Sequence, residues 1–135
     1  MGAPSNDNLR IFACPRTHDQ VVAWFKPFPK GRVLDLGAGE GALSKRLPEE
    51  GFEVRALDLM PEQFRAVGIP CDCGDLNGRM PYEEDSFDYL CAVELIEHLE
   101  DPFGFVRECR RIGRTGPRPQ DMRIGLSQEQ FGNIG

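Results

Sequence analysis

The sequence of 135 residues predicts an α/β fold in which a parallel sheet of about four strands is flanked by helices. Three observations lead to this prediction. Short apolar segments typical of strands alternate along the chain with segments of helical pattern. A glycine-rich turn, residues 37–41, directly follows the first strand segment, and an aspartate stands near the end of each of the first three strand segments. Strands that alternate with helices pair in parallel, so their carboxyl ends share one edge of the sheet.

The first part of the chain is expected to contain a helix, a strand and a second helix. Residues 17–28 place apolar side chains at helical spacing and reach two prolines at their end. Residues 32–36, RVLDL, have the pattern of a buried strand. Residues 41–50 are predicted to form a helix, because Gly51 stands where glycine commonly ends one.

The middle of the chain is expected to add two more strands. Residues 53–57 are predicted as the second strand, and a short helix over residues 61–67 begins at a proline. Residues 69–73 make a weaker third strand because Pro70 interrupts it. The CDC sequence within that strand has the wrong spacing for a zinc knuckle, and no second pair exists, so we assign it no metal role.

A loop, a strand and a helix follow. Residues 76–86 are rich in Gly, Pro, Asn and acidic side chains, which is typical of a loop. Residues 87–93 form a continuous apolar stretch suited to a strand buried on both faces. A helix is predicted over residues 101–112, with Asp101 as its N-cap and Pro102 in its first turn.

The composition is that of one globular domain. Hydrophobic residues make up 40% of the chain and charged residues 28%, and no apolar run approaches the ~18 residues of a membrane-spanning helix. The net charge of −6 argues against broad binding to nucleic acid, and we interpret the arginines beyond residue 106 as a solvated basic face. Five cysteines without C-x-x-C pairs, and no secretory signal, predict reduced thiols in a cytoplasmic protein.

The glycine turn and the strand-end aspartates define a candidate ligand site. The glycines lack the Cβ atoms that would keep a ligand away from the backbone. Asp35 could accept a hydrogen bond from an ammonium group, and Asp58, after the second strand, could accept from both hydroxyls of a ribose. Asp75, after the third strand, could accept from an adenine amino group. Together these residues predict a site for an adenosine-bearing ligand with a cationic end.

Four ordered motifs, VLDLGAGEG, RALDLM, CGDL and FDYLCAVELIEHLEDP, resemble those of class I S-adenosylmethionine-dependent methyltransferases. The resemblance covers roughly residues 31–112 and is particularly to the small-molecule branch, which includes the ubiquinone-pathway methyltransferases. It implies a Rossmann-like sheet, S-adenosyl-L-methionine as the cofactor, and direct transfer of the methyl group to a small-molecule acceptor. Because the sulfonium is already activated and alignment supplies much of the rate, the lack of an obvious base is no objection.

The resemblance also implies which residues contact the cofactor. The glycine turn would approach its methionine part, with Asp35 near the ammonium group and Asp58 on the ribose hydroxyls. The two residues after Asp58 would flank the adenine, Asp75 with Leu76 would bound its edge, and residues 92–94 would lie beneath the sulfonium and face the acceptor. The residues implied in cofactor binding are Asp35, Gly37, Ala38, Gly39, Asp58, Leu59, Met60, Asp75, Leu76, Ala92, Val93 and Glu94.

An E-x-x-E-H run is formed by Glu94, Glu97 and His98, and on a helical turn it would place Glu94 beside the other two. These side chains could bind a divalent metal, as a similar run does in some O-methyltransferases, or His98 could serve as a general base. We favour a crevice-lining or helix-capping role and expect no metal, since the other histidine, His18, lies far away in sequence. Glu94 and His98 are the candidate catalytic residues.

The pattern after Ile112 departs from that family. Its sheet normally has seven strands, whereas GRTGPRPQ stands here in place of the expected turn and apolar strand. We therefore expect the carboxyl-terminal strands to be largely missing and the fourth strand to be a bare apolar edge. Either the tail or a second copy, in a homodimer, would cover this edge.

Three regions are expected on these grounds. Residues 1–16 would be a flexible N-terminus, residues 17–112 an S-adenosylmethionine-binding Rossmann-like domain, and residues 113–135 an irregular C-terminal tail. The tail has glycine and proline punctuation and offers one short strand candidate, at residues 122–126.

Two alternative functions remain open. Gly37-x-Gly39-x-x-Ala42, with Asp58 about 20 residues further on, also fits the pattern of an NAD-dependent oxidoreductase. Asp35 argues against it, because that position would face the pyrophosphate, and the chain lacks a second domain for a hydride acceptor. The other alternative is a truncated, non-catalytic methyltransferase-like protein that binds the cofactor or serves as a partner subunit. The sequence does not identify the methyl acceptor.

Overall fold

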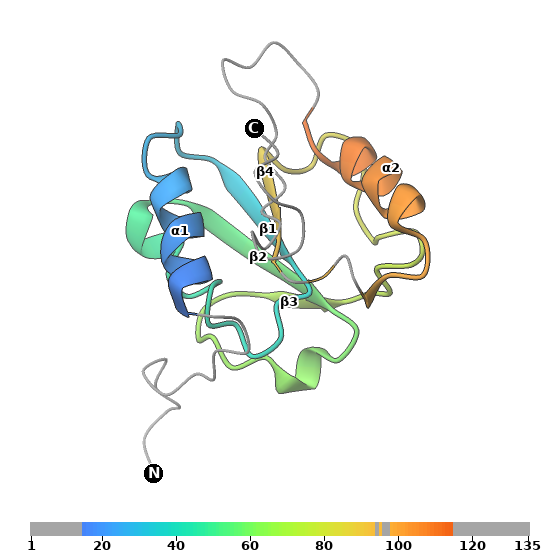
Figure 1. Cartoon of the computed structure of the whole chain (residues 1–135), viewed down its shortest axis with the longest axis horizontal. Helices are drawn as coiled ribbons and strands as arrows, with labels where there is room; N and C mark the ends of the chain where they lie inside the picture. The colour runs from blue at the N-terminus through green and yellow to red at the C-terminus, as the bar shows by residue number, and fades with distance from the viewer. Residues whose placement is uncertain (1–14, 94, 96–97, 115–135) are drawn as a thin grey trace.

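The computed structural model describes residues 15–93, 95 and 98–114. Figure 1 shows the strands lying between the two α-helices. The α-helices are α1, Pro15–Phe25, and α2, Pro102–Ile112; the 3-10 helices are η2, Pro48–Glu50, and η3, Pro61–Gln63; the strands are β1, Arg32–Leu36, β2, Glu53–Asp58, β3, Cys71–Cys73, and β4, Tyr89–Ala92.

The four strands form one parallel sheet in the order β3-β2-β1-β4. β1 lies in its centre, with Asp35 opposite Ala56 of β2 on one side and opposite Cys91 of β4 on the other. β3 pairs with the end of β2, where Asp58 lies opposite Cys73. The predicted Rossmann-like parallel sheet of about four strands is therefore confirmed, and the carboxyl ends of all four strands lie at one edge.

The two faces of the sheet carry two separate apolar clusters, since alternate strand residues point to opposite faces. On one face α1 and the segment after the glycine turn cover the strands; this cluster comprises Val21, Val22, Phe25, Val33, Leu43, Leu47, Phe52, Val54 and Cys91. On the other face α2 and the loop before β4 cover them; this cluster comprises Leu34, Leu36, Leu57, Leu76, Met80, Phe87, Leu90, Ala92, Phe105, Cys109 and Ile112. The burial of β1 on both faces agrees with its continuous apolar pattern.

Two predicted helices are wrong. Residues 41–50 form a series of turns that ends in η2, because Gly41 has a φ of +94° and Pro48 lacks the N–H that a continuing helix would need. Gly51 does end this segment, with its N–H donating to the Pro48 carbonyl. The helix predicted over residues 61–67 is limited to η3, and Phe64 is already extended, with its ring lying against Gly41.

The other boundaries differ by a few residues. α1 ends at Phe25, because Pro27 disfavours helical backbone at the residue before it, and α1 begins at Pro15, two residues earlier than predicted. β4 is shorter than predicted. α2 agrees closely with its prediction, and the Asp101 carboxylate accepts a hydrogen bond from Gly104 N at 2.9 Å as its N-cap. Residues 76–86 contain no helix or strand, as expected of a loop.

The outer side of β4 is an edge of the sheet among the described residues, as predicted. Beside the start of β4, Phe87 and Gly113 form an isolated parallel bridge, and Arg114 N donates to the Phe87 carbonyl at 2.7 Å. The proposed tail beyond this point, with its strand candidate at residues 122–126, lies outside the described residues, and so does most of the predicted flexible N-terminus. Within the described part of the chain, no helix has the length and apolar character needed to cross a membrane.

The central strand should carry much of the stability. Leu34 is fully buried, with 0% of its surface exposed, so Leu34→Ala should lower the free energy of unfolding by about 2 to 5 kcal/mol through lost burial and the resulting cavity. Phe103→Ala is the matched control, because this side chain on α2 is 80% exposed and should matter little. Urea unfolding of both variants would measure the difference, and equal effects would contradict the central role of β1.

Candidate functional site

The glycine turn after β1 adopts a backbone that requires glycine. Gly37 and Gly41 have φ values of +69° and +94°, in a region that other residues rarely adopt. A Cβ on Gly41 would lie 2.7 Å from the Phe64 ring and 2.8 Å from Ala66 Cβ. The turn is held to β2 by Gly37 N, which donates to the Leu57 carbonyl at 2.8 Å. The turn therefore lies at the carboxyl edge of the sheet, between the ends of β1 and β2.

Asp58 joins the end of β2 to this turn. Its Oδ2 accepts a hydrogen bond from Gly39 N at 2.8 Å, and its Oδ1 accepts one from Met60 N at 2.9 Å. Each carboxylate oxygen can accept a further hydrogen bond, so Asp58 can bind the backbone and ligand hydroxyls together. The next two side chains, Leu59 and Met60, are 65% and 46% exposed. They form an apolar surface beside the carboxylate.

Asp35 lies beneath the turn rather than on an open surface. Only 3% of it is exposed, its Oδ2 accepts from Ser44 Oγ at 2.6 Å, and Cys91 Sγ donates to its Oδ1 at 3.7 Å. Burial raises the pKa of Asp35 to about 6, and the hydrogen bonds from Ser44 and Cys91 oppose that shift. Ser44 was missed in the sequence because its segment was predicted to be a helix. A role for Asp35 toward a ligand ammonium group stays a prediction.

The ends of β3 and β4 approach the glycine turn from the other side. Asp75 is exposed, and its Oδ1 accepts from Asn77 N at 2.8 Å. Leu76 is buried, and a Cβ on Gly37 would lie 3.6 Å from Leu76 Cδ1 and 3.1 Å from Leu95 Cδ1. The segments that follow β1, β3 and β4 therefore meet at Gly37.

The residues predicted after β4 are only partly described. Ala92 is buried and Val93 is half-buried, while His98 is exposed. Glu94 and Glu97 of the E-x-x-E-H run lie outside the described residues. Among the residues that are described, no group of three or more His, Cys, Asp or Glu side chains could hold a metal ion.

His18 is a buried residue of α1, the helix that packs against the segment after the glycine turn. Its neighbour on α1, Asp19, forms an ion pair at 2.8 Å with Arg46, which follows the glycine turn closely in sequence. Only 6% of His18 is exposed, and its Nδ1 has no hydrogen-bond partner in the described part of the chain. Burial, with Arg46 as a second cause, lowers the pKa of His18, which favours the neutral imidazole at pH 7. The ion pair between Asp19 and Arg46 joins residues far apart in the sequence, so no local pattern predicts it.

The cysteines differ in their surroundings. All four described cysteines are free thiols. Burial raises the pKa of Cys71 to about 11 and that of Cys109 to about 12, and it raises the pKa of Cys91 well above the usual value. Cys73, at the carboxyl end of β3, is exposed, with its Sγ 3.6 Å from the Leu59 carbonyl.

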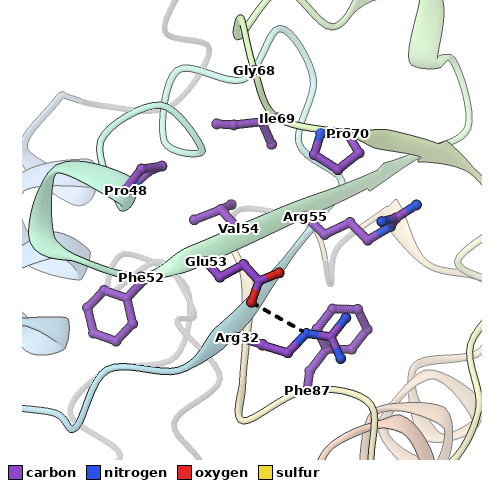
Figure 2. A pocket seen from close by; sticks show the side chains of 10 residues that line it. All are labelled: Arg32, Pro48, Phe52, Glu53, Val54, Arg55, Gly68, Ile69, Pro70 and Phe87. Carbon is purple, nitrogen blue, oxygen red and sulfur yellow. Dashed lines mark ion pairs between the residues drawn. The ribbon is translucent and has the colours of Figure 1, made fainter.

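A pocket of about 330 Å³ lies away from this edge, near the amino ends of the strands (Figure 2). Arg32, at the start of β1, lies 4.0 Å from Glu53, at the start of β2, and over the Phe87 ring. Arg55, which also lines the pocket, pairs through two nitrogens with Asp72. Because both arginines already face carboxylates, the pocket offers no clear anion site, and the carboxyl edge of the sheet remains the candidate functional site.

A parallel sheet with a glycine turn after an inner strand and a carboxylate after the next strand is the arrangement of the Rossmann-like fold. Comparison with known families narrows this class. The family described as "Methyltransferase domain" matches residues 34–117, and the chain belongs to this family.

Individual relatives support the family assignment. The chain is 32% identical over 97 residues to a ubiquinone biosynthesis O-methyltransferase of Xanthomonas campestris, covering 65% of the chain and 41% of that relative. It is 31% identical over 125 residues to an uncharacterized methyltransferase of Mycobacterium bovis. This match covers 85% of the chain and 51% of that relative. The fold is similar to that in a crystal structure of a Pyrococcus horikoshii protein, with a TM-score of 0.63 and 26% sequence identity. This match covers 73% of the chain and 51% of that protein. The chain thus spans between two fifths and about half of these proteins.

The buried Asp35 should make stability depend on pH. Because its pKa in the folded protein, about 6, lies above the 3.8 of the free side chain, the folded state binds the proton more tightly. This group therefore stabilises the fold less as pH rises from about 4 to about 6. Asp35→Asn removes the effect, so the difference in unfolding free energy, variant minus wild type, should rise by about 3 kcal/mol over that range.

Urea unfolding between pH 4 and 8 would measure this difference. The direct comparison is needed because Asp72 and Glu108, whose pKa values are lowered by hydrogen bonds from Arg55 and Arg111, make the fold lose stability as pH falls. Ser44→Ala should move the transition of Asp35 to higher pH, because it removes a hydrogen bond that lowers this pKa. Identical pH profiles for wild type and Asp35→Asn would contradict the prediction.

Proposed function

We propose that this protein binds S-adenosylmethionine at the carboxyl edge of its sheet and transfers the methyl group directly to a small molecule. The observation that carries the proposal is the hydrogen bond between Asp58 and Gly39 N, because it joins the glycine turn and the acid after β2 into one site. The family match and the methyltransferase relatives support the same activity.

The arrangement of side chains suits an adenosine group. Asp58 would take the ribose hydroxyls while it holds the turn, and the exposed Leu59 and Met60 would flank the adenine ring. Asp75 has one oxygen committed to Asn77 N, and its Oδ2 has no hydrogen-bond partner among the described residues, so it could accept from the adenine amino group. We propose the same cofactor-binding role for the other residues that the sequence analysis named as cofactor contacts.

An oxygen atom of a small molecule is the proposed methyl acceptor. Support comes from the relatives named as O-methyltransferases of ubiquinone biosynthesis. The cofactor would supply an already activated methyl group, so the protein has mainly to align the acceptor. His98 is exposed and could take a proton from an acceptor hydroxyl, and it remains the candidate base together with Glu94, which lies outside the described residues.

The free thiols support a cytoplasmic location, which we propose for this protein. We also propose that residues 17–112 form the domain and that the segments on either side of it are flanking regions. The family match favours a methyltransferase over an NAD-dependent oxidoreductase. In the non-catalytic alternative, the chain binds the cofactor without transferring the methyl group. An assay of methyl transfer, rather than of binding, distinguishes this alternative from an enzyme.

Calorimetry with S-adenosylhomocysteine tests the cofactor site. Wild type should bind it and should not bind NAD⁺. Asp58→Asn should weaken binding roughly ten- to hundredfold, since it removes a charged acceptor. Glu62→Gln is the control, because it removes a carboxylate from η3 without altering the turn. If wild type binds neither S-adenosylmethionine nor S-adenosylhomocysteine, the enzyme proposal is wrong, and binding of NAD⁺ would favour the oxidoreductase.

We also propose a homodimer in which a second copy lies against the outer side of β4, because β4 is the last strand on its side of the sheet among the described residues and sheet edges favour association. Sedimentation velocity of the full chain should then show a dimer. A stable monomer at the concentrations of the binding assays would contradict this.

A further inference from the structure

Asn77 connects two loops at the candidate site and has no role in the proposal above. Its backbone N donates to Asp75 Oδ1 at 2.8 Å, and its side-chain Oδ1 accepts from Glu100 N at 2.7 Å. The first bond lies within the turn after β3, which a third bond, from Gly78 N to the Asp75 carbonyl at 3.1 Å, closes. The second bond spans 23 residues and reaches the segment that follows β4. The exposed Asn77 side chain therefore ties the turn after β3 to the segment between β4 and α2.

The far end of this connection is firmly placed. Glu100 directly precedes Asp101, the N-cap of α2, and α2 is anchored by its buried Phe105, Cys109 and Ile112. At its other end, α2 holds the same loop through Arg111, which donates to the Tyr82 and Met80 carbonyls at 2.6 and 3.0 Å. The loop over residues 76–86 is thus attached to α2 through Met80 and Tyr82, and to the segment before α2 through Asn77.

The other end of the connection lies next to two residues of the candidate site. Asp75 and Leu76 immediately precede Asn77, and Leu76 lies against the glycine turn at Gly37. With Oδ1 of Asp75 held by Asn77 N, its Oδ2 has a fixed direction from which to accept a ligand hydrogen bond. A shift of the turn after β3 would move both the carboxylate and the apolar contact.

We propose that Asn77 is a positioning residue that fixes the adenine-side wall of the crevice by tying the turn after β3 to the segment before α2. The proposal rests on the proposed function, because it assumes that an adenosine group occupies the crevice. Asn77 itself does not need to touch the ligand. Its contribution is the hydrogen bond that it accepts from Glu100 N.

Two variants at one position isolate that bond. Asn77→Ala removes the acceptor but keeps the backbone N–H that serves Asp75, whereas Asn77→Asp keeps an acceptor of similar shape. Asn77→Ala should weaken S-adenosylhomocysteine binding roughly three- to tenfold, as expected for one lost hydrogen bond, and Asn77→Asp should stay within about twofold of wild type. Ser86→Ala is the matched control, because it removes an exposed side-chain hydrogen bond, to the Glu83 carbonyl, from the same loop.

The probe decides which end of the ligand is affected. Methylthioadenosine has the adenosine part without the amino-acid end, so Asn77→Ala should weaken its binding by the same factor. Unchanged affinities, or a loss confined to S-adenosylhomocysteine, would overturn the proposal. A similar loss for Asn77→Asp or Ser86→Ala would also overturn it, because the effect would then not depend on the acceptor.

Amide hydrogen exchange of the full chain separates this proposal from the proposed function. The Glu100 amide should be protected in wild type and in Asn77→Asp and should exchange faster in Asn77→Ala. If wild type binds neither probe while Glu100 is protected, the proposed function fails and the positioning role fails with it. If wild type binds both probes and Glu100 exchanges alike in all variants, the positioning role alone is wrong.

Discussion

The parallel pairing of β1 with strands on both of its sides is the constraint on which the rest of the structure depends. Because β2 and β4 both run in the direction of β1, every connection must return across a face of the sheet before the next strand begins. The returning segments bury the two faces in separate apolar clusters. The same constraint brings the residues after every strand to one edge, where Asp58 bonds to the glycine turn and Leu76 contacts Gly37.

The loop before β4, residues 76–86, contains no helix or strand and is held in place by polar contacts. Arg111 on α2 pairs with Glu108 and donates to two loop carbonyls, and Glu108 accepts from Met80 N at 2.8 Å. On the opposite side of the loop, Tyr82 donates to Asp72 Oδ2 at 2.6 Å, on a carboxylate that also pairs with Arg55. Because Arg111 pairs with Glu108 and Arg55 pairs with Asp72, these charged side chains can be partly buried without leaving a charge unpaired.

The sequence predicted the elements whose signals are local. β1 and β2 follow from the short, largely apolar segments RVLDL and EVRALD, and the Asp101 cap of α2 follows from residues within one turn of it. The helix expected over residues 41–50 failed because Gly41 has a φ of +94°, at a point where Phe64 and Ala66, more than 20 residues further along the chain, leave no room for a Cβ. The strand-end positions of Asp58 and Asp75 could be predicted from topology alone. The hydrogen bonds that place Ser44 and Asn77, and the burial of His18, could not, since they leave no pattern in the neighbouring sequence.

The unequal burial of the cysteines has a practical consequence for chemical labelling. A thiol reacts as its thiolate, and the raised pKa values of Cys71, Cys91 and Cys109 leave little thiolate at neutral pH. Cys73 is the exposed thiol among the four described, and its Sγ lies 3.6 Å from the carbonyl of Leu59, a residue proposed to flank the adenine. In a variant that lacks Cys14, a maleimide dye would therefore attach chiefly at this position. Its fluorescence would report directly on what enters the crevice, without any change to the residues that form it.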